Sequence, residues 1–203
     1  MKLPIMPVVA ITISIILSSC TATQYDHHFK EGYKFDVKSV FVKGYLSDGP
    51  KGLNTDTFTK LVEEQLKPCV DKTITEVELF DFAAAARGHK GFRVGEKELY
   101  EKHDVDAVVG VLEFKRDRVG YYKLGDGGPT SYGEVTRHYK VWYHDNNLRE
   151  TVWRSNIVIQ SRPPIGFFGP NQKAQHLSDA IIKNMAKDGI FADCRPISTK
   201  PKF

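Results

Sequence analysis

The sequence predicts an α/β (α+β) fold in which helices pack on a single mixed β-sheet. Strand and helix patterns alternate over 38–114, and two strand patterns joined by a tight turn follow over 134–161. The expected order is therefore β-α-β-α-β-β-β-α. The 203 residues are 41% hydrophobic and 27% charged, with a formal net charge of +4. These totals exclude collagen-like, disordered and multi-span membrane proteins and are typical of one globular domain.

The first half of this domain alternates strands with helices. Segments that are rich in Val and Phe, or that alternate apolar and polar residues, predict the strands. Apolar residues at helical spacing predict the first helix. Pro68 ends this helix, because the residue before a proline avoids the helical region. The nearly continuous apolar run 106–114 predicts a central strand covered on both faces. Strands are expected over 38–45, 74–82 and 106–114, and helices over 54–66 and 96–103.

The second half predicts a hairpin and a final helix. A Gly-rich excursion covers 121–133, alternating strands are expected over 134–145 and 150–161, and Asn146-Asn147 favour the turn between them. The last helix presents an apolar face that ends at Met185. Gly189 suits the left-handed position after its end, with Ile190 packing back on Met185.

The N-terminal segment differs from the rest of the chain. Lys2 precedes an uncharged apolar run over 3–17, which is typical of a secretory signal peptide and too short for a comfortable bilayer span. The following Leu-Ser-Ser-Cys20 resembles the lipobox of bacterial lipoproteins. That resemblance implies a diacylglycerol on the Cys20 thiol, cleavage before Cys20 and a further acyl chain, such as palmitate, on the new N-terminus. An ordinary signal peptide with an incidental cysteine, or an uncleaved anchor, is the alternative.

This interpretation divides the chain and gives it a location. Residues 1–19 form the signal peptide, 20–36 a lipidated tether, 37–194 the periplasmic domain and 195–203 a flexible basic tail. Several acyl chains hold a protein on a bilayer almost permanently. Thr21 follows the cysteine in place of an aspartate, which resembles an outer-membrane signal if the host is Gram-negative. The expected location is the periplasmic face of the outer membrane.

Two cysteines remain once Cys20 is assigned to lipid. An exported domain meets an oxidising compartment, so a disulfide between Cys69 and Cys194 is expected in preference to two free thiols. It would close a loop of about 125 residues and contribute up to about 4–5 kcal/mol in the chain-entropy model. No spacing of cysteine and histidine indicates a metal site.

The search for catalytic motifs is negative. The sequence has no nucleophile elbow, Walker A loop, zinc-protease motif or dinucleotide fingerprint, so neither an enzyme nor a cofactor is expected. Gly125–Gly128 is expected to cap a hairpin. His138 and His144 lie on one face of a strand but about 20 Å apart. The basic cluster Lys115–Arg118 is expected to be a solvated edge, and nothing indicates a nucleic-acid partner.

One loop stands out as a candidate contact surface. In 163–170 three large apolar residues lie between prolines and glycines and cannot continue a helix or strand. They either cover the sheet or form an exposed patch that binds a partner or a membrane. The candidate partner-binding residues are Ile165, Phe167 and Phe168.

Three segments resemble a family of periplasmic lipoproteins related to the N-terminal domain of TolB. His103–Val111 resembles its G-A-D-a-v-l-x-G-x-v segment and Tyr143–Trp153 its x-l-x-D-x-x-T-G-e-i-v-W hairpin, with Asn147-Leu148 where Thr-Gly is usual. The opening strand 40–45 and the helix 58–66 match the start of the family pattern. The resemblance spans about 38–191. Relatives include the penicillin-binding-protein activator LpoB and the curli secretion subunit CsgG.

The resemblance implies a non-catalytic α/β module that binds protein partners in the envelope. Members like the curli subunit also insert amphipathic hairpins to form a pore, but Tyr121–Tyr132 is too rich in Gly and Asp for such a strand. The expected function is a binding or regulatory module for a cell-envelope machine, attached to the lipid bilayer through acylated Cys20. The alternatives are a self-associating structural subunit of an outer-membrane secretion or assembly complex, or a periplasmic hydrolase.

Overall fold

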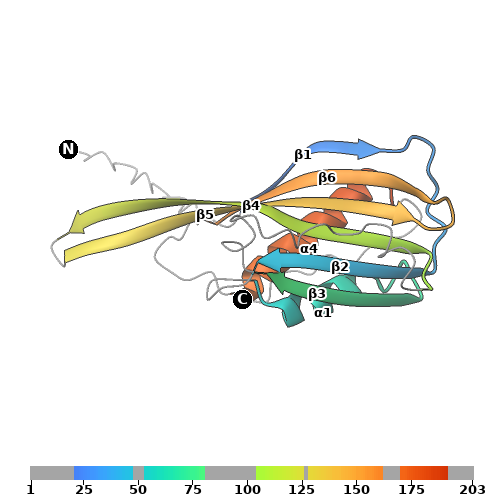
Figure 1. Cartoon of the computed structure of the whole chain (residues 1–203), viewed down its shortest axis with the longest axis horizontal. Helices are drawn as coiled ribbons and strands as arrows, with labels where there is room; N and C mark the ends of the chain where they lie inside the picture. Colours follow the sequence, from blue (N-terminus) through green and yellow to red (C-terminus); the bar gives the residue numbers. More distant parts are fainter. Residues whose placement is uncertain (1–20, 48–52, 81–103, 126–127, 162–169, 192–203) are drawn as a thin grey trace, which may run out of the picture.

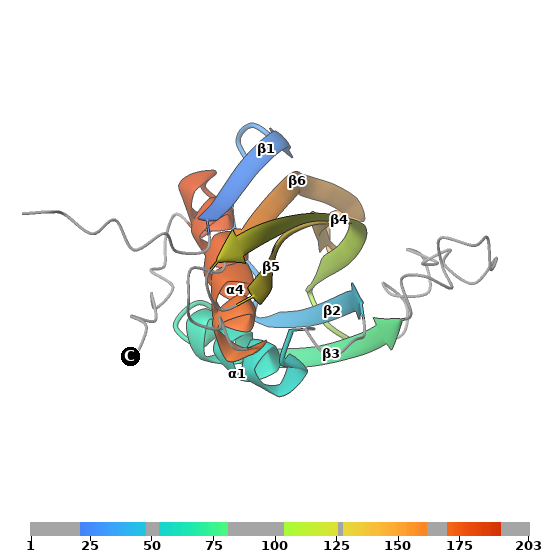
Figure 2. The same cartoon turned by 90° about the vertical axis from the view of Figure 1, so that its left-hand side faces the viewer.

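A mixed six-stranded sheet with two helices on one face forms the domain, as the sequence predicts (Figures 1 and 2). The computed structural model describes residues 21–47, 53–80, 104–125, 128–161 and 170–191. Its elements are β1 (Thr21–Phe29), β2 (Ser39–Ser47), α1 (Thr55–Leu66), β3 (Lys72–Phe80), β4 (Ala107–Gly125), β5 (Gly128–Asp145), β6 (Glu150–Ser161) and α4 (Pro170–Lys187).

The strands lie in the order β1-β6-β5-β4-β2-β3. β2 pairs in parallel with β3 on one side and β4 on the other, whereas all the other neighbours are antiparallel. α1 separates the parallel strands β2 and β3 along the chain, whereas the antiparallel strands β4, β5 and β6 follow one another directly. β1 and β3 are the two edges.

Apolar side chains cover both faces of the central strands. On the helix face, α1 contributes Phe58 and Leu66, and α4 contributes Leu177, Ile181 and Met185, all fully buried against the sheet. A second, smaller cluster lies on the opposite face and consists of Phe41, Tyr45, Val105, Val108 and Trp142. The expectation that the apolar run of β4 is covered on both faces is therefore confirmed.

The predicted ends of both helices are also confirmed. The Asn54 side chain accepts a hydrogen bond from the backbone N–H of Thr57, 2.8 Å away, and so begins α1. Gly189 has a positive φ of 96°, and the Ile190 N–H donates to the Met185 carbonyl at 2.9 Å. These are the left-handed residue and the long-range bond of a Schellman motif, which closes α4.

Two expectations, one about the tether and one about the Gly-rich excursion, are wrong. The segment expected to be a tether begins with strand β1, and the residues after it pack on the domain: the Tyr33 hydroxyl donates to Asp145 at 2.8 Å. The Gly-rich excursion over 121–133 is part of two long paired strands, β4 and β5. The segment 96–103, for which a helix is expected, lies outside the described residues.

Candidate functional site

The ends of β4 and β5 extend beyond the rest of the sheet (Figure 1). β2 pairs with β4 only as far as Leu112, and β6 pairs with β5 only from Val135 onwards. Beyond those points β4 and β5 pair with each other, until Gly125 meets Gly128. We call Val119–Gly125 and Gly128–Glu134 the arm. The hairpin expected at Gly125–Gly128 is confirmed, and its strands are longer than the sequence predicted.

A β-bulge lies at the base of the arm. Glu113 pairs with Tyr139 and Lys115 with His138, so Phe114 is an extra residue on β4. Alternation along a regular strand would place Glu113 and Arg116 on opposite faces. Because of the bulge, Arg116 pairs with Arg137, two residues from Tyr139, and both charged residues of β4 lie on the helix face.

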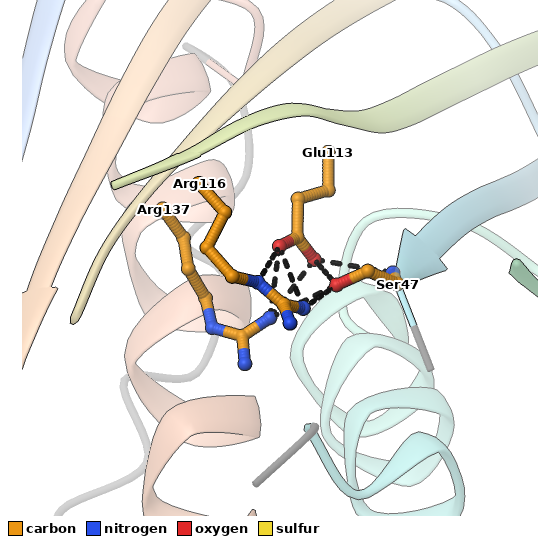
Figure 3. A network of polar contacts seen from close by, with 4 residues as sticks. All are labelled: Ser47, Glu113, Arg116 and Arg137. Carbon is orange, nitrogen blue, oxygen red and sulfur yellow. Dashed lines mark hydrogen bonds and ion pairs between the residues drawn. The ribbon is translucent and has the colours of Figure 1, made fainter. Parts of the chain in front are cut away.

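Four polar side chains from three strands meet at this bulge (Figure 3). One oxygen of the Glu113 carboxylate accepts hydrogen bonds from the backbone N–H of Ser47 at 3.1 Å and from its hydroxyl at 2.6 Å. The other oxygen accepts from Arg116 at 3.1 Å and from Arg137 at 2.8 Å. Arg116 also donates to the Ser47 hydroxyl. We call these four residues the base cluster. It joins the end of β2 to both strands that continue into the arm.

The base cluster is buried and carries net positive charge. The side chains of Glu113, Arg116 and Arg137 are only 1%, 9% and 6% exposed. Burial lowers the pKa of Arg116, while the Glu113 charge raises it. Burial also raises the pKa of the adjacent Tyr139 hydroxyl, and the carboxylate raises it further. Arginine keeps its proton in proteins. The cluster therefore supplies fixed charge and fixed geometry at the arm's base.

The opposite face of the base is open to solvent and combines an aromatic ring with cations. Phe114 is 37% exposed, the Lys140 ammonium lies 5.2 Å from its ring centroid, and the His138 ring lies 6.0 Å away. Asp117 accepts from Lys115 at 2.8 Å and from His138 at 3.0 Å, and the bond from Lys115 is the main cause of a lowered Asp117 pKa. Val119, the first arm residue on β4, is 47% exposed.

The N-terminal strand enters the sheet at the base of the arm. Thr21 pairs with Gln160, Gln160 with Thr136, and Thr136 with Asp117. We call this line of four residues the anchor row, because Thr21 directly follows the predicted acylation site in the sequence. The turn between β5 and β6, with Leu148 at 53% exposure, lies at the other end of the sheet.

Most of the residues that the sequence singled out lie outside the described part of the chain. This applies to Cys20, to Cys194 and to the loop residues Ile165, Phe167 and Phe168, so their roles stay predictions. Cys69 is disulfide-bonded. Its partner lies outside the described residues, and the pairing with Cys194 stays a prediction too.

The histidines of β5 do not form a shared site. His138 contacts Asp117, whereas His144 contacts Thr151 at 3.1 Å. The described residues contain no group of three or more His, Cys, Asp or Glu side chains that could hold a metal ion. Among the helices that the structure describes, none is long and apolar enough to cross a membrane.

The base cluster is the feature that sequence reasoning missed. Lys115–Arg118 was expected to be a solvated edge, but Arg116 points into the fold and is buried. Strand alternation by itself would place Arg116 on the face opposite to Glu113, because the bulge at Phe114 cannot be seen in the residue pattern. A glutamate at the end of an otherwise apolar run, Glu113, was the available signal. Charged residues are seldom fully buried without a partner.

No protein-family model and no curated protein sequence matches the chain. Several solved structures are similar in shape at low sequence identity. The PelC dodecamer from Paraburkholderia phytofirmans has a TM-score of 0.41 and 12% identity, covering 83% of this chain and 96% of that one. Lipoprotein GNA1162 from Neisseria meningitidis has a TM-score of 0.38 and 15% identity, covering 74% and 99%. The hypothetical protein CT253 from Chlamydia trachomatis has a TM-score of 0.38 and 10% identity, covering 77% and 99%.

Proposed function

We propose that the chain is a lipid-anchored protein of the bacterial envelope, in the outer membrane and facing the periplasm. Its folded domain acts as a non-catalytic binding or regulatory module for a cell-envelope machine. The lipobox-like Leu-Ser-Ser-Cys20 supports the anchor. The arm supports the binding role, because it projects beyond the sheet and is placed to contact a partner.

The projecting arm is the observation that carries this proposal. A two-stranded ribbon is at best marginally stable in water by itself. Here a buried cluster of three charged side chains and Ser47 fixes the strands where they leave the sheet. Burying charged side chains costs free energy, and the best-supported role of such a buried cluster is to define one geometry. An arm held in one direction suits contact with another component.

Shortening the arm tests the proposal. Arg118 pairs with Val135, so an Asn-Gly turn in place of 119–134 would close the hairpin there. We expect the shortened chain to keep its thermal midpoint and its membrane attachment. Crosslinking in intact envelopes should recover at least one protein with the natural chain that the shortened chain loses. Recovery of the same proteins with both chains would contradict the proposal.

A second candidate is a structural subunit of an outer-membrane assembly. The described strands leave both edges of the arm without a neighbouring strand, and such edges can pair with those of another copy. Light scattering of the detergent-solubilised full chain separates the two candidates. A subunit would give a protein mass many times 23.0 kDa that falls to the monomer when the arm is shortened.

A further inference from the structure

We infer that the arm is the end of the domain that meets the headgroup layer of the lipid bilayer, with the turn at Leu148 held away from it. The inference rests on the proposed function, because it requires an acylated Cys20. It follows from where β1 begins, from the direction in which the arm projects, and from the residues at its base.

The predicted anchor has no linker. Thr21 is the first residue of β1 and is already paired with Gln160. Cys20 is bonded to Thr21, and consecutive Cα atoms are about 3.8 Å apart. Acyl chains on Cys20 would therefore bring the bilayer surface within about one residue's reach of the anchor row.

The arm continues past this row. β4 runs from Ala107 at the far end of the sheet, reaches the anchor row at Asp117 and extends eight residues further to Gly125. At about 3.3 Å per residue this is about 26 Å. The headgroup layer on each side of a bilayer is only about 5–8 Å thick. An arm of this length, starting beside the anchor and directed away from the domain, therefore reaches the lipid surface.

The residues at the base and in the arm suit the headgroup layer. Phe114 and Val119 expose apolar surface, the Lys140 ammonium lies over the Phe114 ring, and Lys115 pairs with Asp117 nearby on β4. Aromatic residues concentrate at bilayer interfaces, and Lys and Arg near the surface are attracted to anionic lipids. The arm sequence adds three tyrosines, namely Tyr121, Tyr122 and Tyr132.

The ribbon is not suited to the hydrocarbon interior. An unpaired backbone N–H or C=O in hydrocarbon costs several kcal/mol, and no other described strand pairs with the edges of the arm. Headgroups and their water can satisfy those groups. The headgroup layer is thus where one copy of the arm meets lipid without losing backbone hydrogen bonds.

Fluorescence quenching in protein-free vesicles tests the inference. The full acylated chain is reconstituted into vesicles of phosphatidylethanolamine and phosphatidylglycerol that contain a headgroup nitroxide lipid. An environment-sensitive maleimide dye is attached to Val119→Cys, or to Leu148→Cys as the matched control. Both positions are exposed and apolar, and Leu148 lies in the turn about 30 Å beyond the anchor row. Maleimide spares Cys69, which is disulfide-bonded.

We expect quenching at position 119 to be at least twofold stronger than at 148, with blue-shifted emission. Gly120→Cys offers a second label site, because a Cβ there would meet no heavy atom within 4 Å. Equal quenching at the arm and at 148, or stronger quenching at 148, in a chain whose intact mass shows the acyl groups would overturn the inference and leave the proposed function standing. A chain without acyl mass would overturn both.

Discussion

The Glu113 carboxylate accepts hydrogen bonds from β2, from its own strand and from β5. It is the only acid in the base cluster, and its charge interacts with the guanidinium groups of both Arg116 and Arg137. Removing one member of a buried charge network leaves the others uncompensated, which costs far more than the net value of the interaction. Glu113 is therefore the residue on which the geometry of the arm's base depends most.

We expect Glu113→Gln to lower the free energy of unfolding by about 3 kcal/mol, because it removes the buried charge that Arg116 and Arg137 both contact. Urea denaturation at neutral pH measures the change. Glu150→Gln is the control, since Glu150 is 49% exposed and its ion pair with Lys30 lies at the surface. That change should cost less than about 1 kcal/mol. Similar losses in both variants would contradict the role given to Glu113.

Asp106 should make stability depend on acid pH. Its carboxylate accepts from the backbone N–H groups of Lys38 and Ser39 and from the Ser39 hydroxyl, each at 2.9 Å. These bonds, the Lys38 one foremost, hold the pKa of Asp106 below its usual range. Because the folded pKa is lower than the unfolded value of about 3.9, the stabilisation is complete above that value and is lost as the pH falls through the folded pKa.

We expect Asp106→Asn to be less stable than the natural chain at pH 7, by about 2 kcal/mol for lost charge-assisted hydrogen bonds. The difference should shrink as the pH falls below about 4, because the carboxyl of the unfolded chain is protonated first and that of the folded chain at still lower pH. Urea denaturation across this range is the measurement. A difference that stays constant with pH would show that the Asp106 charge does not contribute.

At the scale of elements, the bulge at Phe114 decides which face of β4 each later residue occupies. With it, Arg116 lies beside Arg137 on the helix face, and Lys115 and Asp117 lie on the open face. One further residue inserted after Lys115 would move Arg116 and the later side chains of β4 to the opposite faces. The bulge thus controls the base cluster and the orientation of the arm together.

We expect insertion of one alanine between Lys115 and Arg116 to break the base cluster and loosen the arm while the rest of the sheet persists, because Arg116 then no longer lies opposite Arg137. Tryptic cleavage after Arg118 should become at least tenfold faster, as expected for a ribbon that opens locally. Phe114→Ala keeps the bulge and is the control, with cleavage close to that of the natural chain. Equal cleavage in the insertion variant would mean that the register set at the bulge does not position the arm.

The sequence predicted those elements whose signals are local. The cap at Asn54, the αL residue Gly189 and the hairpin around Asn146 each depend on neighbouring residues and were found correctly. β1 was missed because its stability comes from pairing with β6, more than a hundred residues away, and its own pattern is weak. The bulge was missed because an inserted residue has no signature in alternation by itself.

At the scale of the whole molecule, the sheet has two distinct ends. One holds the anchor row and the arm, and the other holds the turn with Leu148. Cys20 in the sequence predicted a location for the protein at the membrane, but the sequence also predicted a tether between the lipid and the domain. A domain attached through a paired strand has a restricted orientation, which a sixteen-residue tether would not give. This relation is set by strand register and not by any motif.

A linker inserted between Cys20 and Thr21 should release this orientation. Ten Gly and Ser residues have a root-mean-square reach of about 18 Å. We expect the quenching ratio between dye positions 119 and 148 to fall towards one in that variant, with membrane attachment unchanged. The same measurement on a chain with ten residues inserted after Asn147, in the far turn, should retain the ratio. An unchanged ratio in the first variant would mean that β1 does not orient the domain.

β1 leads directly from the predicted anchor into the sheet, so a force on the anchor is carried by the pairing of β1 with β6. A pull on the N-terminal side of Thr21 that is directed away from Phe29 acts along the axis of β1. The ladder bonds to β6 lie across that axis, and they run from Thr21 to Phe29. They would resist the load together in shear, whereas a pull at right angles would open them one after another. The attachment is therefore strongest against a load along β1.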